Sequence, residues 1–301
     1  MVRVIVLVGS SSGFGKALVE EILNSDELTS GNEKTFVALF TTSKERTIGI
    51  WNTAYELSRG KHFADDTSTN IEVIVEQVDL AKSSDCQRAT EVLSLLFSHI
   101  HSPISSLYLF LNSGSVKPVG PILDLGSGEH GTTPAEIAYE TQLREHCSLN
   151  FISFALILKR FVRLAVSHSL SGPMWRLRVV NVSSLAALQP LFGMSAYCAI
   201  KASRDSLLGV LAKELAEQVP TRDIKLLSYA PGPMRTLLVT EHLMAEDCPR
   251  NALKAYKGDF VDPNESAKKC IHLLVANDVQ SHWSSGDHVD FFISLGTANV
   301  P

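Results

Sequence analysis

Two side chains four residues apart carry the strongest chemical signal in the sequence. Tyr197 is followed by Lys201 and then by Asp205, so on a helix that begins near Ser195 all three lie on one face. A lysine ammonium beside a phenol favours the phenolate, which lowers the tyrosine pKa from about 10 towards the working pH. Ser184 lies upstream and could hold a carbonyl oxygen from the other side. This set of groups suits the protonation of an oxygen while hydride reaches its carbon.

A Tyr-x-x-x-Lys pair also occurs on exposed helix faces, where it has no chemical role. Here the β-branched run Val179–Val182 predicts a buried strand that ends in Ser183 and Ser184, and the helix follows. A serine at the end of a strand and a tyrosine on the next helix can converge on one point. The spacing therefore favours the catalytic interpretation.

A glycine-rich stretch follows the first predicted strand, Val2–Val8. It reads Gly9-Ser10-Ser11-Ser12-Gly13-Phe14-Gly15 and leads into a predicted helix over Lys16–Leu23. Glycines allow close backbone approach, and a helix N-terminus offers amide donors and a positive dipole to a diphosphate. The alternative is a flexible turn that binds nothing. The context of strand, turn and helix favours a dinucleotide site.

The end of the second predicted strand, Thr35–Phe40, indicates which dinucleotide is preferred. A carboxylate here would bind the ribose 2′-hydroxyl of NAD, and none is present. Ser43, Lys44 and Arg46 follow instead and would suit a 2′-phosphate, which favours NADP(H). The two cations can equally be solvated charges that open the next helix.

Together these motifs resemble the short-chain dehydrogenase/reductases, whose active site holds a Ser, a Tyr-x-x-x-Lys and an Asn on a helix. The resemblance covers nearly the whole chain and implies that Ser184, Tyr197, Lys201 and Asn150 are catalytic. It implies that the cofactor is bound by Gly9, Ser11, Ser12, Gly13, Phe14, Gly15, Ser43, Lys44, Asp79, Leu80, Asn112, Gly114, Tyr197, Lys201, Pro231, Gly232, Met234 and Thr236.

The chain departs from the family pattern at three places. NADP-dependent relatives often carry an arginine where this chain has Ser12, and another where it has Ser43. Where relatives read Asn-Asn-Ala-Gly, this sequence reads Leu-Asn-Ser-Gly at 111–114.

Asp79 matches an acidic residue that contacts the adenine, and it could also cap the turn that follows its strand.

Four stretches beyond residue 176 read NVSSLAALQP, AYCAIKASRD, SYAPGPM and SGDHVDFF, and they resemble the sepiapterin reductase branch of the family. That branch reduces ketones of pterin side chains, a step of tetrahydrobiopterin synthesis. The resemblance implies a pterin or related dicarbonyl as substrate, bound by Ser184, Tyr197 and Asp290. Asp290 could instead be an exposed carboxylate on an edge strand.

Two other functions remain open on the sequence. One is a broad reductase of diketones or xenobiotic carbonyls, which keeps the chemistry and changes the substrate. The other is a non-catalytic sensor that binds NADP(H), although a sensor has no need of a proton donor.

Seven predicted strands alternate with helices, which indicates a Rossmann-like, doubly wound parallel sheet with helices on both faces. We expect a single domain over 1–301, with a cofactor half over about 1–130, a catalytic half over about 131–301 and a lid over about 237–260. The predicted elements beyond those already named are helices over 44–59, 83–100, 134–166, 195–219 and 263–276, and strands over 71–77, 106–111, 224–229 and 288–292.

Composition narrows the function class. A net charge of −5 gives no reason to expect nucleic acid or anionic membrane as a partner. The five cysteines are scattered and lack CxxC spacing, which predicts neither a disulfide framework nor a metal site and suits the cytoplasm. No apolar run is long enough to span a membrane. Family analogy implies a homodimer that pairs through the helices over 134–166 and 195–219.

Overall fold

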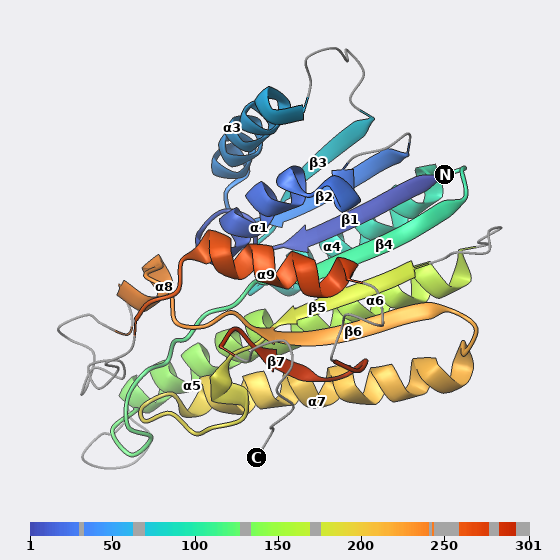
Figure 1. Ribbon diagram of the computed structural model, residues 1–301. Helices are drawn as coiled ribbons and strands as arrows, with labels where there is room; N and C mark the ends of the chain where they lie inside the picture. Colours follow the sequence, from blue (N-terminus) through green and yellow to red (C-terminus); the bar gives the residue numbers. More distant parts are fainter. Residues whose placement is uncertain are drawn as a thin grey trace.

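Seven parallel strands form one sheet in the order β3-β2-β1-β4-β5-β6-β7 (Figure 1). The computed structural model describes residues 1–29, 33–62, 70–126, 134–168, 176–240, 243, 259–276 and 283–292, with backbone alone at 59–62. The strands are β1 (Val2–Val8), β2 (Lys34–Thr41), β3 (Ile71–Gln77), β4 (Ile104–Leu111), β5 (Arg176–Val182), β6 (Asp223–Ala230) and β7 (His288–Asp290). The doubly wound parallel sheet predicted from the sequence is confirmed.

The central strands are buried on both faces, which explains why they are runs of apolar residues rather than alternating ones. Every residue of β1 is buried, and β2 is exposed only at Lys34. The chain runs outwards from β1 to β2 and β3 and then returns to β4 on the other side of β1. Ligands bind at such a switch point, beyond the carboxyl ends of the strands.

Two layers of helices cover the sheet (Figure 1). One face packs against α1 (Gly13–Asn24), α3 (Lys44–His62) and α9 (Pro263–Val275). The other packs against α4 (Ser83–His99), α6 (Ser153–Ser167) and α7 (Ser195–Gln218). Asp262 caps α9 by accepting hydrogen bonds from the backbone of Asn264 and Glu265, as its position before Pro263 predicts.

The long helix predicted over 134–166 is interrupted. The structure has α5 (Pro134–Cys147), a π-helical turn over Ser148–Ile152, and then α6. The backbone N–H of Ser153 reaches back five residues to the carbonyl of Ser148, which is the π-helical pattern. Asn150 lies at the middle of this turn. Two short helices, α2 (Asp26–Thr29) and α8 (Leu237–Thr240), were not predicted.

A buried arginine connects α7 to the sheet. Arg204 is 1% exposed, and its Nε donates to Asn181 Oδ1 of β5 at 2.8 Å. Its terminal nitrogens donate to the carbonyls of Leu111 (2.7 Å) and Ser113 (3.2 Å) at the end of β4. The guanidinium also lies 4.3 Å from the ring centroid of Phe154 on α6. One side chain thus joins two strands and two helices.

Asp205 continues this polar layer to the edge of the sheet. Asn181 Nδ2 donates to Asp205 Oδ1 (2.8 Å) and to Ser228 Oγ (3.1 Å), and His288 Nδ1 donates to Asp205 Oδ2 (2.7 Å). Asn181, Ser228 and His288 are register neighbours on β5, β6 and β7. A row of polar side chains therefore runs under α7 from the switch point to the edge strand.

Candidate active site

The glycine-rich turn after β1 packs directly against the segment after β4. Asn112 and Ser113 both donate backbone hydrogen bonds to Val8 O at 3.0 Å, and Asn112 Nδ2 donates to Gly9 O at 2.6 Å. A Cβ on Gly9 would lie 2.7 Å from Ser113 N. A Cβ on Gly15 would lie 1.8 Å from Gly9 O. Glycine is therefore required at both positions for the two chain segments to meet at the switch point.

The segment after β6 closes on the same turn. Gly13 has a positive φ of 52°, and its missing Cβ would lie 3.2 Å from Thr236 Cγ2. Gly232 (φ 81°) lets the backbone turn next to Val261. Pro231 is buried. Met234 is 7% exposed and packs in the hydrophobic core between the sheet and the layer of α1 and α9. The structure thus brings together the turn after β1 and the segment 231–236, as the sequence predicts.

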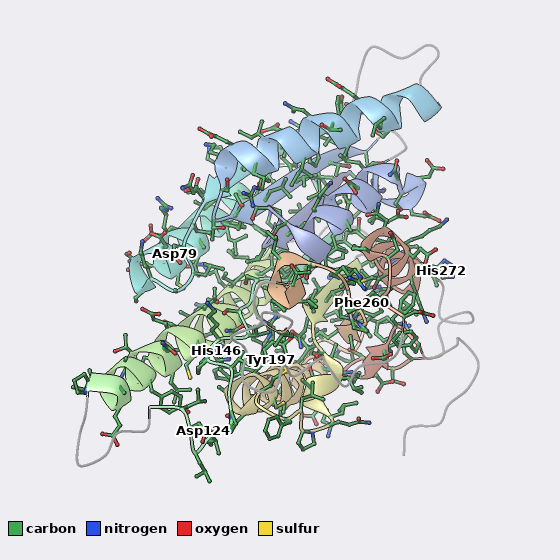
Figure 2. The ribbon with its side chains drawn as sticks, turned by 90° about the vertical axis from the view of Figure 1, so that its left-hand side faces the viewer. Asp79, Asp124, His146, Tyr197, Phe260 and His272 are labelled. Atoms are coloured by element: carbon green, nitrogen blue, oxygen red, sulfur yellow. The ribbon has the colours of Figure 1, made fainter. Side chains whose placement is uncertain are left out.

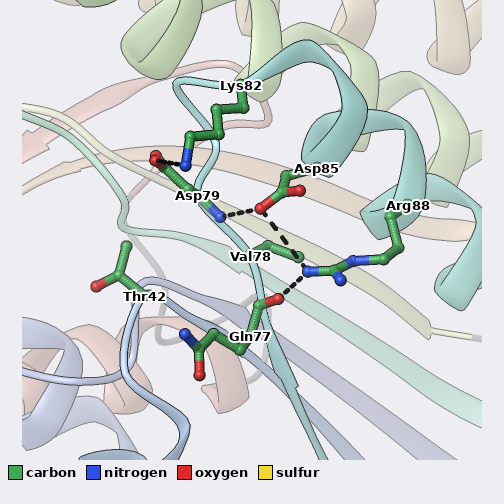
Figure 3. Close-up of a pocket in the computed structure, with 7 residues that line it drawn as sticks. All are labelled: Thr42, Gln77, Val78, Asp79, Lys82, Asp85 and Arg88. Carbon is green, nitrogen blue, oxygen red and sulfur yellow. Dashed lines mark hydrogen bonds and ion pairs between the residues drawn. The ribbon is translucent and has the colours of Figure 1, made fainter.

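A pocket of about 280 Å³ lies at the ends of β2 and β3 (Figure 3). It is lined by Thr42, Gln77, Val78, Asp79, Lys82, Asp85 and Arg88. Asp79 accepts from the backbone of Ala81 (3.2 Å) and pairs with Lys82 Nζ (3.2 Å). The capping role considered for Asp79 is therefore present, and the same residue lines a pocket at the carboxyl ends of the strands, the edge of the sheet where ligands bind in this fold.

The end of β2 is organised by threonines. Thr41 is 2% exposed and accepts hydrogen bonds from Ser43 N (3.1 Å) and Thr47 Oγ1 (2.9 Å). This turn starts α3, and Lys44 and Arg46 in its first turn are exposed. Both cations thus stand at the rim of the site beside Ser43.

Ser184, Tyr197 and Lys201 come together at the carboxyl end of β5. Ser184 begins a short 3₁₀ helix (Leu185–Ala187), and its hydroxyl accepts from Ala186 N at 3.2 Å. Tyr197 lies in the first turn of α7 and is hydrogen-bonded to Ser184. Lys201, one turn later, is 4% exposed and donates from Nζ to Val182 O at 2.6 Å. Its Nζ lies 5.4 Å from the centroid of the Tyr197 ring.

The electrostatics differ from the sequence-based expectation that Lys201 lowers the pKa of Tyr197. Burial raises the pKa of Tyr197 above its ordinary value, and the effects that oppose this rise are the hydrogen bond with Ser184 and the charge of Arg204. Burial, followed by the charge of Arg204, lowers the pKa of Lys201 well below its ordinary value. Because a buried lysine holds its proton less firmly, the fixed cation that acts on Tyr197 is Arg204. The sequence analysis assigned no function to Arg204.

Asn150 holds the segment after β4 in place. It is fully buried, and its Oδ1 accepts from Ser115 N at 2.9 Å. A Cβ on Gly114 would lie 2.7 Å from Asn150 Oδ1, so glycine is required at that position as well. Asn150 Nδ2 donates to the carbonyl (3.0 Å) and to Nδ1 (3.0 Å) of His146. His146 is a second residue of this site that the sequence analysis missed.

Some residues expected to bind the cofactor have their side chains in the core instead. Phe14 is 5% exposed and stacks on Tyr229 with ring centroids 6.1 Å apart. Leu80 is 4% exposed and packs with the α4 layer. Met234 packs in the core of the opposite layer. Only the backbone of these three residues is available to a ligand.

An apolar cluster surrounds Tyr197. Val116, Met194, Val239 and Leu243 are its buried members, and Cys198 and Phe260 pack against them. Val239, Leu243 and Phe260 come from the lid expected over 237–260. The rest of that segment beyond α8, including His242, Met244 and Cys248, lies outside the described residues. The described part of the expected lid thus packs in the same cluster as Tyr197, which is half-buried.

β7 carries Asp290 at the edge of the sheet. Val289 and Phe291 pack against the α9 layer, whereas His288 reaches Asp205 on α7. Alternation along the strand places Asp290 on the same side as His288. Asp290 Oδ1 accepts from Phe292 N at 2.8 Å, and the chain turns there, so the strand is shorter than the 288–292 predicted.

Within the described residues, no group of three or more His, Cys, Asp or Glu side chains is arranged to hold a metal. None of the described helices is long and apolar enough to cross a membrane.

Comparison with known proteins identifies the family. The model of the short chain dehydrogenases matches residues 3–247. The chain belongs to this family. It is 31% identical to the sepiapterin reductase of Xenopus laevis over 295 residues, which cover 95% of this chain and 94% of the relative. The resemblance predicted from the sequence is confirmed.

Other relatives match over shorter stretches. The sepiapterin reductase of Xenopus tropicalis is 44% identical over 118 residues, which cover 38% of this chain and 41% of the relative. The benzil reductase of Bacillus cereus is 24% identical over 236 residues, 78% of this chain and 76% of the relative. Among solved structures, ElxO with NADP bound has a TM-score of 0.65 at 18% identity, covering 96% of this chain and 97% of ElxO, which shows the same fold.

Gly15→Ala tests whether the switch point needs close backbone contact. The new methyl group would overlap Gly9 O, so the glycine-rich turn must move away from the segment after β4. We expect the dissociation constant for NADP⁺, measured by fluorescence or calorimetry, to rise at least about tenfold, which corresponds to about 1.4 kcal/mol. Gly49→Ala is the matched control, because Gly49 is exposed on α3 and a Cβ there meets nothing within 4 Å. Equal affinity in both variants would contradict this account.

Proposed function

We propose that this protein is an NADPH-dependent carbonyl reductase of the sepiapterin reductase type. Its substrate would be the side-chain ketone of a pterin or a related dicarbonyl. The observation that carries the proposal is the convergence of Ser184 and Tyr197 at the carboxyl edge of the sheet, beside the turn after β1. The similarity to the Xenopus sepiapterin reductases supports the substrate class.

In this proposal each of the four predicted catalytic residues has a separate task. Bound NADPH supplies the hydride. The Tyr197 hydroxyl donates the proton to the carbonyl oxygen, and Ser184 holds that oxygen by a hydrogen bond. Lys201 binds the nicotinamide ribose from its position beside Val182 O, and Asn150 completes a route for protons to the lysine. The apolar cluster around Tyr197 excludes water.

The raised pKa of Tyr197 fits the role of a proton donor. A phenol whose pKa lies above the working pH remains protonated until the carbonyl oxygen acquires negative charge. Ser184 and Arg204 both favour the phenolate that forms, so they stabilise the product of the transfer. The proton is therefore retained in the resting site and released during reduction.

Tyr197→Phe tests this role. We expect kcat to fall at least about 100-fold, the lower end for general acid catalysis, with the affinity for NADPH little changed. The measurement is NADPH consumption at 340 nm with a 1,2-dicarbonyl substrate. Tyr139→Phe on α5, away from this site, is the matched control. Unchanged turnover would remove Tyr197 from the mechanism, and a wild-type protein that binds NADPH but reduces no dicarbonyl would favour the sensor function.

The preference for NADPH follows from the rim of the site at the end of β2. No carboxylate stands there to repel a 2′-phosphate, and the exposed Lys44 and Arg46 flank Ser43. ElxO, which has the same fold, binds NADP. Phosphate would be held by the first-turn cations and the amides of α3.

Removing both cations, in a Lys44→Ala and Arg46→Ala double variant, should weaken NADPH binding and leave NADH binding unchanged. Each lost charged hydrogen bond costs about 1.5–3 kcal/mol, which predicts at least a tenfold loss for NADPH alone. Lys159→Ala serves as the control, because Lys159 is exposed on α6, in the helix layer on the opposite face of the sheet from α3. Equal dissociation constants for NADPH and NADH in the wild type would show that this rim does not recognise the phosphate.

A broad-specificity diketone reductase is the alternative. The similarity to the benzil reductase of Bacillus cereus favours it, and the chemistry at Tyr197 would be the same. The two functions are separated by kcat/KM for sepiapterin and for simple vicinal diketones. Diketones preferred by several orders of magnitude would exclude the pterin assignment.

Asp290→Ala tests the proposed pterin anchor. A carboxylate can accept two parallel N–H bonds from the amino-pyrimidine edge of a pterin, as it does from arginine. We expect pterin binding to weaken by about 1.5–3 kcal/mol, while NADPH binding and reduction of a small diketone stay nearly unchanged. Asp287→Ala is the control on the same segment, since Asp287 is exposed and its carboxylate caps Ser284 N. A variant that keeps full pterin affinity would end the pterin assignment.

We also propose that the chain acts as one cytoplasmic domain and forms a homodimer through the helices on either side of the site. Ile152 and Leu156 on or next to α6 are 49% and 44% exposed, and Val210 on α7 is 54% exposed. Apolar side chains on these helices are suited to pairing with a second copy. Light scattering would measure the oligomeric state.

A further inference from the structure

His146 is a buried histidine at the active site to which no role has been assigned. It lies in the last turn of α5 and is 2% exposed. His146 and Tyr197 are labelled next to each other in Figure 2. The backbone groups of Lys117 and of Ala196, the residue before Tyr197, lie beside the ring. Nε2 of the ring has no hydrogen-bond partner of good geometry in the described structure, and these backbone groups lie close enough to affect the charge of the ring.

The hydrogen bonds around Asn150 determine the state of the ring. Ser115 N can only donate, so the atom of Asn150 that faces it is the oxygen. The amide nitrogen of Asn150 then points at His146, where its two hydrogens go to the carbonyl and to Nδ1. Nδ1 must therefore be an acceptor. The ring is neutral and carries its hydrogen on Nε2.

A proton on Nδ1 would break this arrangement. The protonated nitrogen and the amide nitrogen of Asn150 would both be donors facing each other at 3.0 Å. Asn150 would have to rotate, and its oxygen would leave Ser115 N. The same oxygen packs against Gly114, where an added Cβ would lie 2.7 Å away, so Gly114 and Ser115 would lose the support of Asn150.

We propose that His146 is a positioning residue: through Asn150, its neutral ring holds the backbone of Gly114 and Ser115 in the binding conformation, and uptake of a proton by the ring releases that backbone. The π-helical turn that carries Asn150 is consistent with this role, because such turns occur frequently at functional sites. The turn places the Asn150 side chain between His146 and Ser115.

The electrostatic surroundings agree with a neutral ring. Burial lowers the pKa of His146 below its ordinary value. The backbone of Lys117 and Ala196 opposes this shift, and the charge of Lys201 on α7 adds to it. The ring is therefore neutral at pH 7 and above and takes up a proton only as the solution becomes acidic. Cofactor binding should then weaken as the pH falls and should be restored as it rises.

Two substitutions separate the two ring nitrogens. His146→Asn places an amide oxygen near the position of Nδ1, so it can still accept from Asn150 but cannot titrate. His146→Gln reaches the position of Nε2, so Asn150 Nδ2 loses its side-chain acceptor and keeps only the backbone carbonyl of residue 146. Both variants are polar and smaller than or similar in size to histidine, which limits differences in packing.

The experiment measures NADP⁺ binding to the full-length protein by calorimetry between pH 7.5 and pH 5.5. The phosphate group of NADP⁺ itself titrates near pH 6, and this contribution is the same for every variant. The test therefore compares the pH dependence of binding between variants. We expect wild-type affinity to fall about five- to tenfold more than that of His146→Asn, the size of one lost hydrogen bond. His146→Gln should bind five- to tenfold more weakly already at pH 7.5.

The same pH dependence in wild type and His146→Asn would overturn the proposal. If the variants do not fold, nitrogen-15 NMR of the imidazole in the wild-type protein decides. A hydrogen on Nε2 and titration below the ordinary histidine range support it, and a hydrogen on Nδ1 or a ring charged at pH 7 overturns it. The proposal rests on Asn150 serving the cofactor site. Because the experiment measures NADP⁺ binding and not turnover, a failure of this proposal can be distinguished from a failure of the proposed reductase activity.

Discussion

The site depends above all on one buried guanidinium. Arg204 carries a permanent charge in a place with almost no solvent, and the loss of hydration is compensated only because three oxygens accept its hydrogens. Two of these oxygens are backbone carbonyls at the end of β4, and the third is the Asn181 side chain of β5. A charge in this setting fixes its partners, since any one of them that moved away would leave a buried donor unsatisfied. The arginine therefore sets the position of α7 against the carboxyl ends of β4 and β5.

Arg204 affects Tyr197 and Lys201 in two ways. Tyr197 and Lys201 lie on the same helix as Arg204, within two turns, so fixing α7 also fixes where the phenol and the amine stand. The charge itself acts over the same short distance. It lowers the pKa of Tyr197 against the effect of burial, and it adds to the lowering of the pKa of Lys201. The Arg204 side chain thus both positions α7 and alters the pKa values of Tyr197 and Lys201. These two effects help to explain why this position holds a buried charge, although apolar side chains could be buried here at a lower cost in free energy.

The sequence predicts the parts of the fold that depend on local pattern. Short β-branched runs that are followed by glycine, such as Val2–Val8, favour buried strands, and the glycine spacing and the Tyr197–Lys201 pair follow from distances along the chain. The sequence predicts contacts between distant segments poorly. The roles of Arg204 and His146 depend on carbonyls and an amide far from them in sequence, and the π-helical turn has no local signature. The core positions of Phe14 and Leu80 could not be separated from ligand contact by spacing alone. The shift of the Tyr197 pKa was predicted in the wrong direction because burial cannot be read from spacing.

The edge strand β7 shares one support with α7, the helix that carries Tyr197 and Lys201. β7 has three residues, and among the described strands it pairs with β6 alone, so its ladder of hydrogen bonds is short. The hydrogen bond between His288 and Asp205 connects this strand to α7. Asp205 also accepts a hydrogen bond from Asn181, which itself accepts one from Arg204. β7, the strand that carries Asp290, is therefore connected to the helix that carries Tyr197. An edge strand usually tolerates change more easily than a central one, but here a shift of β7 would be transmitted through His288 and Asp205 to α7. Because this contact runs through a polar side chain of α7 rather than through the central strands, the position of β7 depends on the same helix that carries Tyr197 and Lys201.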